Sequence, residues 1–355
     1  MKKIQVNASV CYDVVIGKDI LKDAGAYIKA LGVAEKVMLV SDDTVFGLYG
    51  EKAADSLRNA GFDVKTFVFP HGEGSKNIDT YGQLLEKALS DNISREDIFV
   101  SLGGGVVGDL TGFAAATYKR GIRFVQLPTT LLAAVDASVG GKTAIDLKGG
   151  KNQAGAFHQP SLVLCDTLTL HTLPDEQYLS GMAEVIKTAM IADPALFEKL
   201  EGADLRLADQ DAEEIIATCV DIKRRFVTED EFDRGVRKML NFGHTFGHAI
   251  EAASGFTVPH GYAVAAGMAL ITRSACNKGL CSDDVPARLE SLLEKNGLPT
   301  DTKYKAAKLL PYVAEDKKAA GGAVDLILPV SAGKCIIQRT PLSEIEDYMY
   351  DGGIR

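Results

Sequence analysis

The first 166 residues alternate short β-rich runs with amphipathic stretches, and this alternation constrains the fold more than any other feature. The segment IQVNASVCYDVVI predicts two strands. Five further buried strands are predicted at VMLVSD, DVKTFVFP, DIFVSLGG, RFVQLP and SLVLCD. Between them, residues 44–61 and 79–92 have helical spacing and stop at Gly61 and Asn92. Strand, helix and strand in succession predict a parallel sheet with helices on both faces.

The pattern changes after Asp166. From about residue 173 to 295 the sequence is mainly helical, and VDLILPV predicts one strand near the end. The sequence therefore predicts an α/β domain over residues 1–170 and a mainly α-helical domain over residues 171–355, with residues 171–174 as the connection. Ligands gather at the carboxyl ends of parallel strands and in clefts between domains, so the expected site lies there.

Residues 240–261, LNFGHTFGHAIEAASGFTVPHG, contain three of the chain's six histidines. His244 and His248 are four apart, so both imidazoles project from one face if the segment is helical. His260 follows a short loop and precedes the apolar run AVAAGMALI. Any one of them could cap a helix or fill a core, but three together favour a metal centre. Such a centre needs three protein ligands and an open position, and His/His/Glu is a common set.

The best carboxylate for that set is Glu184, within the apolar helix LSGMAEVIKTAMIA. Its alternative role is an ion pair with Lys187 at the next turn. An acid in such apolar surroundings is costly unless it is paired or binds a cation. We therefore favour Glu184 as a metal ligand, with Lys187 as a neighbour in the same site.

A glycine-rich turn, GGGVVGDLTGFAAATY, directly follows the strand DIFVSL. Gly103, Gly105 and Gly108 satisfy G-x-G-x-x-G at a strand-to-helix junction, the setting in which a pyrophosphate binds a helix N-terminus. A tight turn with close helix packing is the alternative. The next strand does not end in an acid, whereas Asp42 closes an earlier strand. Asp42 could bind a ribose hydroxyl or cap the following helix.

Basic and polar residues gather around further glycine turns. The loop HGEGSKN offers Glu73 and Lys76, although a solvated loop explains it equally well. More candidates lie in VDASVGGKTAIDLKGGKNQAG and near the histidines: Asp136, Lys142, Lys151, Asn152, Lys223, Arg237 and Asn241. Each lysine alone is more commonly a surface charge. Together, in a chain of net charge −9, they indicate a local site for phosphate or carboxylate.

Composition excludes several classes of partner. A net charge of −9 argues against nucleic acid and anionic membranes. The apolar runs are too short or too interrupted to span a bilayer, and MKKIQVNASV lacks the apolar core of a secretory signal. The six cysteines are scattered without a CxxC pair, as expected for reduced thiols in a cytoplasmic protein.

Five blocks in order resemble the 3-dehydroquinate synthase family. They are GGGVVGDLTGFAAATYKRGI, QLPTTLLAAVDASVGGKTAID, KNQAGAFHQP, LSGMAEVIK and LNFGHTFGHAIE. The resemblance implies a Rossmann-like NAD-binding domain followed by an α-helical domain that binds metal and substrate. It also implies NAD, one divalent metal (zinc or cobalt) and a homodimer.

The resemblance also assigns roles to residues of this chain. The implied metal ligands are Glu184, His244 and His260. The implied dinucleotide contacts are Asp42, Glu73, Lys76, Gly104, Gly105, Asp109, Thr129 and Thr130, with Lys142 and Lys151 nearby. The implied substrate contacts are Arg120, reaching the partner subunit's site, and Asp136, Lys142, Lys151, Asn152, Lys187, Lys223, Arg237, Asn241, His248 and either Lys317 or Lys318. Of these, Asp136, Lys142, Asn152, Lys187 and His248 are the implied catalytic residues.

The implied substrate is a sugar-acid phosphate, 3-deoxy-D-arabino-heptulosonate 7-phosphate, which is converted to 3-dehydroquinate and phosphate. Two positions depart from the family pattern, Asp233 for Glu and His158 for Tyr. Three alternatives stay open: a related cyclase making an inosose or a valiolone, a metal-dependent polyol dehydrogenase, and a non-catalytic dinucleotide sensor. Asn152, Asn241 and His248 together favour dehydroquinate synthase over the related cyclases.

Overall fold

The computed structural model describes all residues except 33, 203–205, 208 and 318–321. The chain forms two compact units: Met1–Leu173 with Asp209–Phe232, and Pro174–Ala208 with Asp233–Arg355. The expected boundary near residue 170 is close to the first division. Residues 209–232 differ, because the sequence placed them in the helical domain and they lie in the first unit. Helical spacing shows that a segment has an apolar face but not which surface that face will cover.

The first unit contains a seven-stranded sheet in the order β1-β2-β9-β6-β5-β3-β4. Its strands are β1 (Lys2–Asn7), β2 (Cys11–Gly17), β3 (Lys36–Asp42), β4 (Asp63–Phe69), β5 (Ile98–Gly103), β6 (Arg123–Pro128) and β9 (Leu162–Asp166). The pairs β2–β9, β6–β9, β5–β6, β3–β5 and β3–β4 are parallel, and β1–β2 is antiparallel. The predicted parallel-sheet α/β fold is confirmed, with an antiparallel strand at one edge.

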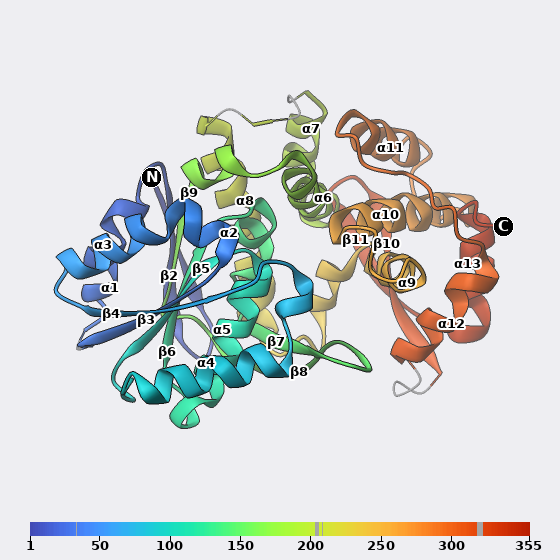
Figure 1. Ribbon diagram of the computed structural model, residues 1–355. Coiled ribbons are helices and arrows are strands. Elements are labelled where there is room, and N and C mark those ends of the chain that lie inside the picture. Colours follow the sequence, from blue (N-terminus) through green and yellow to red (C-terminus); the bar gives the residue numbers. More distant parts are fainter. Residues whose placement is uncertain (33, 203–205, 208, 318–321) are drawn as a thin grey trace. The chain divides into compact units, whose positions relative to one another are not determined.

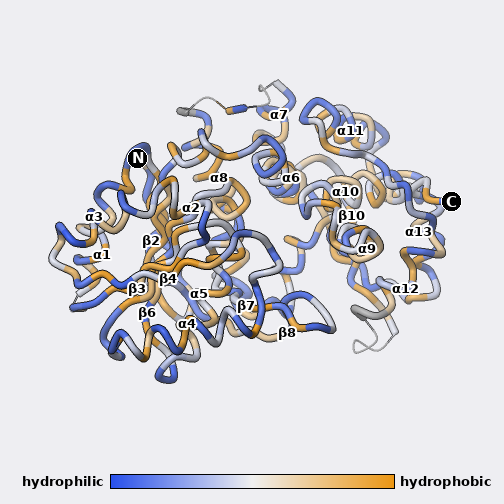
Figure 2. The backbone as a smooth tube through the Cα atoms, viewed as in Figure 1, coloured by the Kyte–Doolittle hydropathy of each residue, from blue (hydrophilic) through white to orange (hydrophobic). Residues whose placement is uncertain are grey.

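Both faces of this sheet are apolar and are covered by helices. On β3, Val37 and Leu39 join the core that includes α1 (Ala24–Lys29) and α3 (Glu51–Asn59). Met38 and Val40 face the other core, built with the helices α4 (Ile78–Ser90) and α5 (Gly105–Thr117). Successive strand residues point to opposite faces, so one apolar run serves both helical layers. Figure 1 shows the layers, and Figure 2 shows hydrophobic strands between them.

Further elements complete the first unit. Helix α8 (Asp209–Glu229) packs against β1 and β2, and a π-helical turn, η5 (Ala133–Ala137), follows β6. Strands β7 (Lys142–Leu147) and β8 (Gly150–Phe157) form an antiparallel hairpin. The glycines of this segment predicted turns and did not predict strands. The short connecting helices are η1 (Leu21–Asp23), α2 (Asp43–Val45), η2 (Phe46–Gly50), η3 (Glu73–Ser75), η4 (Tyr118–Arg120) and η6 (Thr167–Thr172).

The second unit is mainly helical and is organised around the buried helix α10 (His260–Asn277), which contacts α6, α9, α11 and α13. The remaining helices are α6 (Asp175–Ala192), α7 (Pro194–Gly202), η7 (Val236–Asn241), α9 (His244–Ala253), α11 (Val285–Lys295), α12 (Ala306–Lys317), η9 (Leu342–Glu344) and α13 (Ile345–Asp351). The predicted strand near the end is β10 (Ala323–Ser331), which pairs with β11 (Lys334–Pro341). Among the described residues, none of the helices has the length and apolarity needed to cross a bilayer.

Candidate metal centre and dinucleotide loop

Two glycines allow the helices of the second unit to approach closely. A Cβ atom on Gly261 would lie 2.2 Å from the carbonyl oxygen of Ser180 in α6. A Cβ atom on Gly267 would lie 2.1 Å from the carbonyl oxygen of Gly243, immediately before α9. No side chain fits at such distances, so glycine is required at both positions. The Gly261 amide also donates a 2.9 Å hydrogen bond to Ser180 Oγ. Helix α10 therefore packs closely against α6 and against the start of α9.

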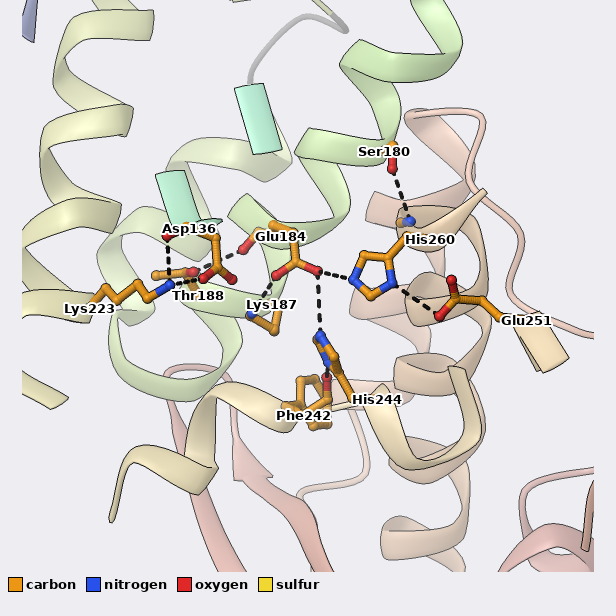
Figure 3. A network of polar contacts seen from close by, with 11 residues as sticks. Asp136, Ser180, Glu184, Lys187, Thr188, Lys223, Phe242, His244, Glu251 and His260 are labelled. Carbon is orange, nitrogen blue, oxygen red and sulfur yellow. Dashed lines mark hydrogen bonds and ion pairs between the residues drawn. The ribbon is translucent and has the colours of Figure 1, made fainter. Parts of the chain in front are cut away.

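Glu184, His244 and His260 converge where these helices meet (Figure 3). Glu184 Oε1 lies 3.4 Å from Nε2 of His260 and 3.7 Å from Nε2 of His244. Glu184 is 1% exposed, and the two histidines are partly buried. His244 is the first residue of α9, and His260 is the first residue of α10. Residues separated by 76 positions in the sequence thus form one cluster.

The two imidazoles are oriented by partners on their other nitrogen. Nδ1 of His244 lies 3.1 Å from the carbonyl oxygen of Phe242, and Nδ1 of His260 lies 3.1 Å from Oε2 of Glu251. Because both partners are acceptors, each Nδ1 carries the proton in the neutral ring. The lone pair is then on Nε2, the atom that faces Glu184.

This donor set fits a divalent cation. Both carboxylate oxygens of Glu184 are buried and, among the described residues, lack a hydrogen bond of good geometry, although Oε2 forms a close ion pair with Lys187. Ligand bonds of about 2.1 Å in a tetrahedral zinc site place neighbouring ligand atoms about 3.4 Å apart. The separations from Glu184 Oε1 to the two Nε2 atoms are 3.4 and 3.7 Å. Both roles considered for Glu184 are therefore compatible, because each oxygen faces a different group.

The local electrostatics separate the two histidines. Burial lowers the pKa of His244 well below its usual range, and the nearby Lys187 lowers it further. Burial also lowers the pKa of His260, but the carboxylates of Glu184 and Glu251 outweigh it and raise the pKa to about 10. Without a cation, His260 therefore holds a proton beside Glu184. A cation would replace that proton, because both require the Nε2 lone pair.

His248 lies beside this cluster and is more exposed than its neighbours. Its ring centroid is 5.3 Å from that of His244 and 6.0 Å from that of His260. Ligand atoms of His248, Glu251 and His260 also lie within 4.8 Å of one another. The structure thus brings together all three histidines that the sequence singled out, with one of them away from Glu184.

Two other predicted residues of this unit are deeply buried cations. Lys187 and Arg237 are each 1% exposed, Lys187 in α6 and Arg237 in η7. Asn241 ends η7, three residues before His244. Burying cationic side chains this completely requires anionic partners from the protein or from a ligand.

The glycine turn of the first unit has the expected strand-to-helix form. Gly103 ends β5, and Gly104 precedes α5, which begins at Gly105 without a side-chain cap on its N-terminal amides. A Cβ atom on Gly104 would lie 2.9 Å from Cγ2 of Thr130, and the Thr129 amide donates to the carbonyl of Gly103 at 3.0 Å. The uncapped amides of this helix N-terminus suit an anion such as a pyrophosphate.

Asp42 ends β3 and caps the next helix, since its Oδ1 accepts a 2.8 Å hydrogen bond from the Val45 amide. The capping alternative is therefore realised. Burial raises the pKa of Asp42. Its neighbour Asp43, which the sequence analysis did not mark, accepts from the amide and ring of His71 at 3.0 and 2.7 Å.

Lys76 is the centre of a buried polar cluster in the first unit. Its Nζ donates to Oδ2 of Asp109 and to Oδ1 of Asn152, both at 2.6 Å. Glu73 lies 4.0 Å from Lys76 and 3.9 Å from Lys151. Burial raises the pKa of Asp109, and Lys76 opposes that shift. Sequence reasoning gave Asn152 and Lys76 to different ligands, whereas the β7–β8 hairpin places them in contact.

The remaining predicted residues are less clustered. Nζ of Lys223, on α8, forms a close ion pair with Asp136 Oδ1 and donates to its carbonyl at 2.6 Å. Lys142 is exposed at the start of β7, and Arg120 is exposed with a positive φ of 68°. Of the two C-terminal candidates, Lys317 ends α12 and Lys318 lies outside the described residues.

Glu251 is the residue of this site that the sequence analysis missed. It is 3% exposed on α9 and contacts Nδ1 of His260 at 3.1 Å. A signal was present, because a carboxylate three residues after His248 lies on the same helix face as that histidine. His158, by contrast, has a structural role: Nε2 lies 2.9 Å from the Ile122 carbonyl and the ring stacks on Phe124.

Comparisons with known proteins agree with this arrangement. The chain matches the 3-dehydroquinate synthase N-terminal family over residues 66–180 and the 3-dehydroquinate synthase C-terminal family over residues 181–319. It is 42% identical over 352 residues to the 3-dehydroquinate synthase of Streptococcus thermophilus (strain ATCC BAA-491 / LMD-9), covering 98% of this chain and 99% of the relative. The 3-dehydroquinate synthase of Streptococcus sanguinis (strain SK36) is 43% identical over 343 residues, 95% of this chain and 96% of the relative.

Solved structures share the fold. A 2-deoxy-scyllo-inosose synthase complexed with carbaglucose-6-phosphate, NAD+ and Co2+ has a TM-score of 0.89 at 27% identity, covering 98% of this chain and 99% of that chain. The 2-epi-5-epi-valiolone synthase of Streptomyces hygroscopicus subsp. jinggangensis 5008, with NAD+ and Zn2+ bound, has a TM-score of 0.88 at 28% identity, covering 99% of each chain. A glycerol dehydrogenase from Schizosaccharomyces pombe, at 17% identity and a TM-score of 0.63, shares the fold alone.

The sheet unit with its glycine turn and the helical unit with its His/His/Glu cluster define the class of sugar-phosphate cyclases. Identity over nearly the full length places the chain within that class. It belongs to the 3-dehydroquinate synthase family.

Proposed function

We infer that this chain converts 3-deoxy-D-arabino-heptulosonate 7-phosphate to 3-dehydroquinate and phosphate. The observation that carries this inference is 42% identity to a curated 3-dehydroquinate synthase over 98% of the chain. The chain is an NAD- and metal-dependent phosphorus–oxygen lyase of the shikimate pathway, which leads to aromatic amino acids. The cofactor requirement is supported by the NAD+ with Co2+ or Zn2+ in the two related cyclases.

Glu184, His244 and His260 would hold the metal, because Oε1 of Glu184 and the Nε2 atoms of both histidines converge. The uncapped amides at Gly104 and Gly105 would hold the pyrophosphate of NAD. When bound, the metal supplies binding and acidification of substrate hydroxyls, and NAD supplies a hydride acceptor that returns the hydride within the same turnover.

The substrate carries a carboxylate and a phosphate, and this acidic chain must attract it with local cations. We assign that role to the predicted basic residues of the two units: Lys142, Lys151, Lys187, Lys223 and Arg237. Lys187 and Arg237 are the most deeply buried of these residues, each 1% exposed. Asp136, Asn152, Asn241 and His248 would orient the substrate. Much of the catalysis is then positioning, because the substrate's phosphate can itself serve as the base that removes the neighbouring proton.

Turnover of purified substrates tests this function. The full chain with NAD and zinc should release phosphate from the seven-carbon sugar acid phosphate and form a cyclic product, with no accumulation of NADH. Phosphate release from glucose 6-phosphate or from a heptose 7-phosphate lacking the carboxylate, with none from the sugar acid, would identify a different cyclase. Net NADH formation from a polyol would identify a dehydrogenase.

Several finer assignments complete the proposal. We propose that the chain acts as a cytoplasmic homodimer in which Arg120 reaches the partner's phosphate site, and that zinc or cobalt is the loaded metal. We also assign NAD binding to the first unit, with residues 209–232 counted in it, and the binding of metal and most of the substrate to the second unit. Light scattering of the purified chain tests whether it is a dimer, and elemental analysis identifies the metal that it carries. A monomer at working concentration would remove the role of Arg120.

A further inference from the structure

We propose that Glu251 is a positioning residue that fixes His260 as a metal ligand and tunes the affinity of the metal centre. This inference rests on the proposed function and deepens it. Glu251 itself would not touch the metal. It would act through the second nitrogen of the imidazole.

The contact is specific in atoms and burial. Oε2 of Glu251 lies 3.1 Å from Nδ1 of His260, while Nε2 of the same ring faces Glu184 Oε1 at 3.4 Å (Figure 3). Glu251 lies on α9 and His260 begins α10, so the contact joins the two helices that supply the histidines. The Glu251 side chain is only 5% exposed. A buried carboxylate requires a partner of this kind.

The geometry assigns the two sides of the imidazole to different tasks. With Nδ1–H donated to Glu251, the ring is held in one tautomer and one orientation, and the negative charge raises the electron density available at Nε2. His244 is oriented in the same way by the backbone carbonyl of Phe242. The two ligands therefore differ in one respect, because one has a neutral backbone partner and the other has a charged side chain that mutation can change.

A second use of Glu251 is a direct ligand role, because His248, Glu251 and His260 also have ligand atoms within 4.8 Å of one another. The contact distance argues against it. At 3.1 Å, Glu251 and Nδ1 of His260 are in direct hydrogen-bond contact, and His248 is exposed. A cation between Glu251 and His260 would have to displace the proton on Nδ1 of His260. That proton is the one that keeps Nε2 available as the ligand atom beside Glu184.

Cobalt titration of the metal-stripped full chain tests the proposal, with affinity, stoichiometry and the visible absorption of the bound Co2+ as readouts. Glu251→Gln keeps the volume and one acceptor oxygen but removes the charge. Glu251→Met keeps a similar volume and removes the acceptor. We expect one Co2+ per chain throughout and affinity about 10- to 100-fold weaker in the Met variant. The Gln variant should lie between the Met variant and the parent, and the absorption spectrum should change most in the Met variant.

Glu290→Gln is the matched control. Glu290 is a partly buried carboxylate of the same unit, paired with Arg273 at 2.6 Å. Arg273 lies thirteen residues after His260 on α10, about 20 Å along the helix. This variant should bind Co2+ like the parent, so a general effect of removing a paired carboxylate charge is separated from an effect on His260.

Three results would overturn the proposal. The first is parental affinity and spectrum in both Glu251 variants. The second is two Co2+ ions per parent chain with one lost from the variants, which would make Glu251 a direct ligand. The third is equal weakening by Glu290→Gln. A parent chain that binds Co2+ in this way but does not turn over the sugar acid phosphate would reject the proposed function and leave the role of Glu251 standing.

Discussion

The glycine turn of the first unit and the histidine cluster of the second are built from different materials. At the turn, Gly104 and Gly105 present backbone amides, and no charged side chain caps the helix. At the cluster, the buried side chains of Glu184 and Lys187 and the partly exposed His260 bring charges together. The first site depends on the space that glycine leaves, whereas the second depends on charge balance.

This difference determines which mutations are informative. A site made of backbone is broken by adding atoms, and the loss appears in ligand affinity while folding is kept. A site made of buried charges is broken by removing one partner, and the loss can appear in stability, in affinity or in both.

The largest effect is expected from His244→Ala, which removes one of the three ligand atoms. Metal content should drop from one ion per chain to well below that value. Losing several kcal/mol of electrostatic stabilisation of the reaction corresponds to a loss of roughly 10³-fold or more in kcat/KM. Elemental analysis and phosphate release measure the two effects.

His171→Ala is the control, because His171 is exposed and lies in the first unit. It should keep both metal and turnover. A His244→Ala chain that retains a full complement of zinc would contradict the assignment of the cluster as a three-ligand centre.

Lys76→Met tests whether the first unit also contains a site made of charge. It leaves Asp109 without the Lys76 partner that it meets at 2.6 Å. Because Asp109 keeps 21% exposure, we expect a loss of about 2 kcal/mol in the free energy of unfolding, below the range for fully buried pairs. Urea denaturation measures it.

The pH dependence of this variant has a definite sign. Burial already raises the pKa of Asp109 despite Lys76, and removing Lys76 raises it further. A raised folded-state pKa of a carboxyl group destabilises the fold at higher pH, so the deficit should shrink as the pH falls and Asp109 is protonated. The double variant Lys76→Met/Asp109→Asn should recover part of the stability at pH 7. A single variant as stable as the parent would show that this pair contributes nothing to stability.

The sequence predicted the parallel sheet and the convergence of the cluster for different physical reasons. Strand periodicity and turn residues are local properties, so the strands from β1 to β6 and β9 were found. The cluster was found because an acid in an apolar helix is costly unless it is paired or binds a cation, and because three histidines close together in the sequence favour metal binding. Glu251 was missed because its position three residues after His248 indicates only a shared helix face, whereas its role depends on a 3.1 Å contact with His260 on another helix.

The β7–β8 hairpin and the placement of α8 were also missed. Glycines at 140, 141, 149 and 150 suggested turns, and the strand between them is short and half exposed. Helix α8 has an ordinary apolar face, and only tertiary packing decides that it covers β1 and β2. Long-range packing of this kind is outside what spacing can predict.

Gly105→Ala tests the site made of backbone without disturbing the fold. The added Cβ would lie 3.7 Å from Cβ of Ala137, an ordinary contact, at the first residue of α5. Its methyl group would hinder the approach of the pyrophosphate to the backbone amides. We expect about tenfold weaker NAD binding, about 1.4 kcal/mol, with metal content and stability unchanged. Calorimetric titration with NAD measures it.

Gly82→Ala is the matched control for that prediction. Gly82 lies inside α4, and a Cβ atom added there would have no neighbouring atom within 4 Å among the described residues. Replacing it should raise stability by about 0.5–1 kcal/mol and leave NAD affinity unchanged. Equal NAD affinity in the parent and in Gly105→Ala would mean that the glycine turn does not bind the pyrophosphate and serves only the close packing of α5.

Asp19→Asn should have the smallest effect, because the two ion pairs that it removes are largely exposed to solvent. Asp19 is paired with Lys22 and Lys52, each at 2.7 Å, and hydrogen bonds to these two lysines lower its pKa to about 2. Asparagine tolerates the φ of 58° at this position, so the backbone should be unaffected.

A lowered carboxyl pKa gives stability that is fully present above the ordinary pKa of 3.8 and is lost as the pH falls towards about 2. The small difference in melting temperature between parent and variant should therefore persist from pH 7 to 5 and narrow near pH 3, and added salt should reduce it. A difference that widens in acid would show that Asp19 stabilises the fold through its neutral form, which would remove the contrast between exposed and buried charge.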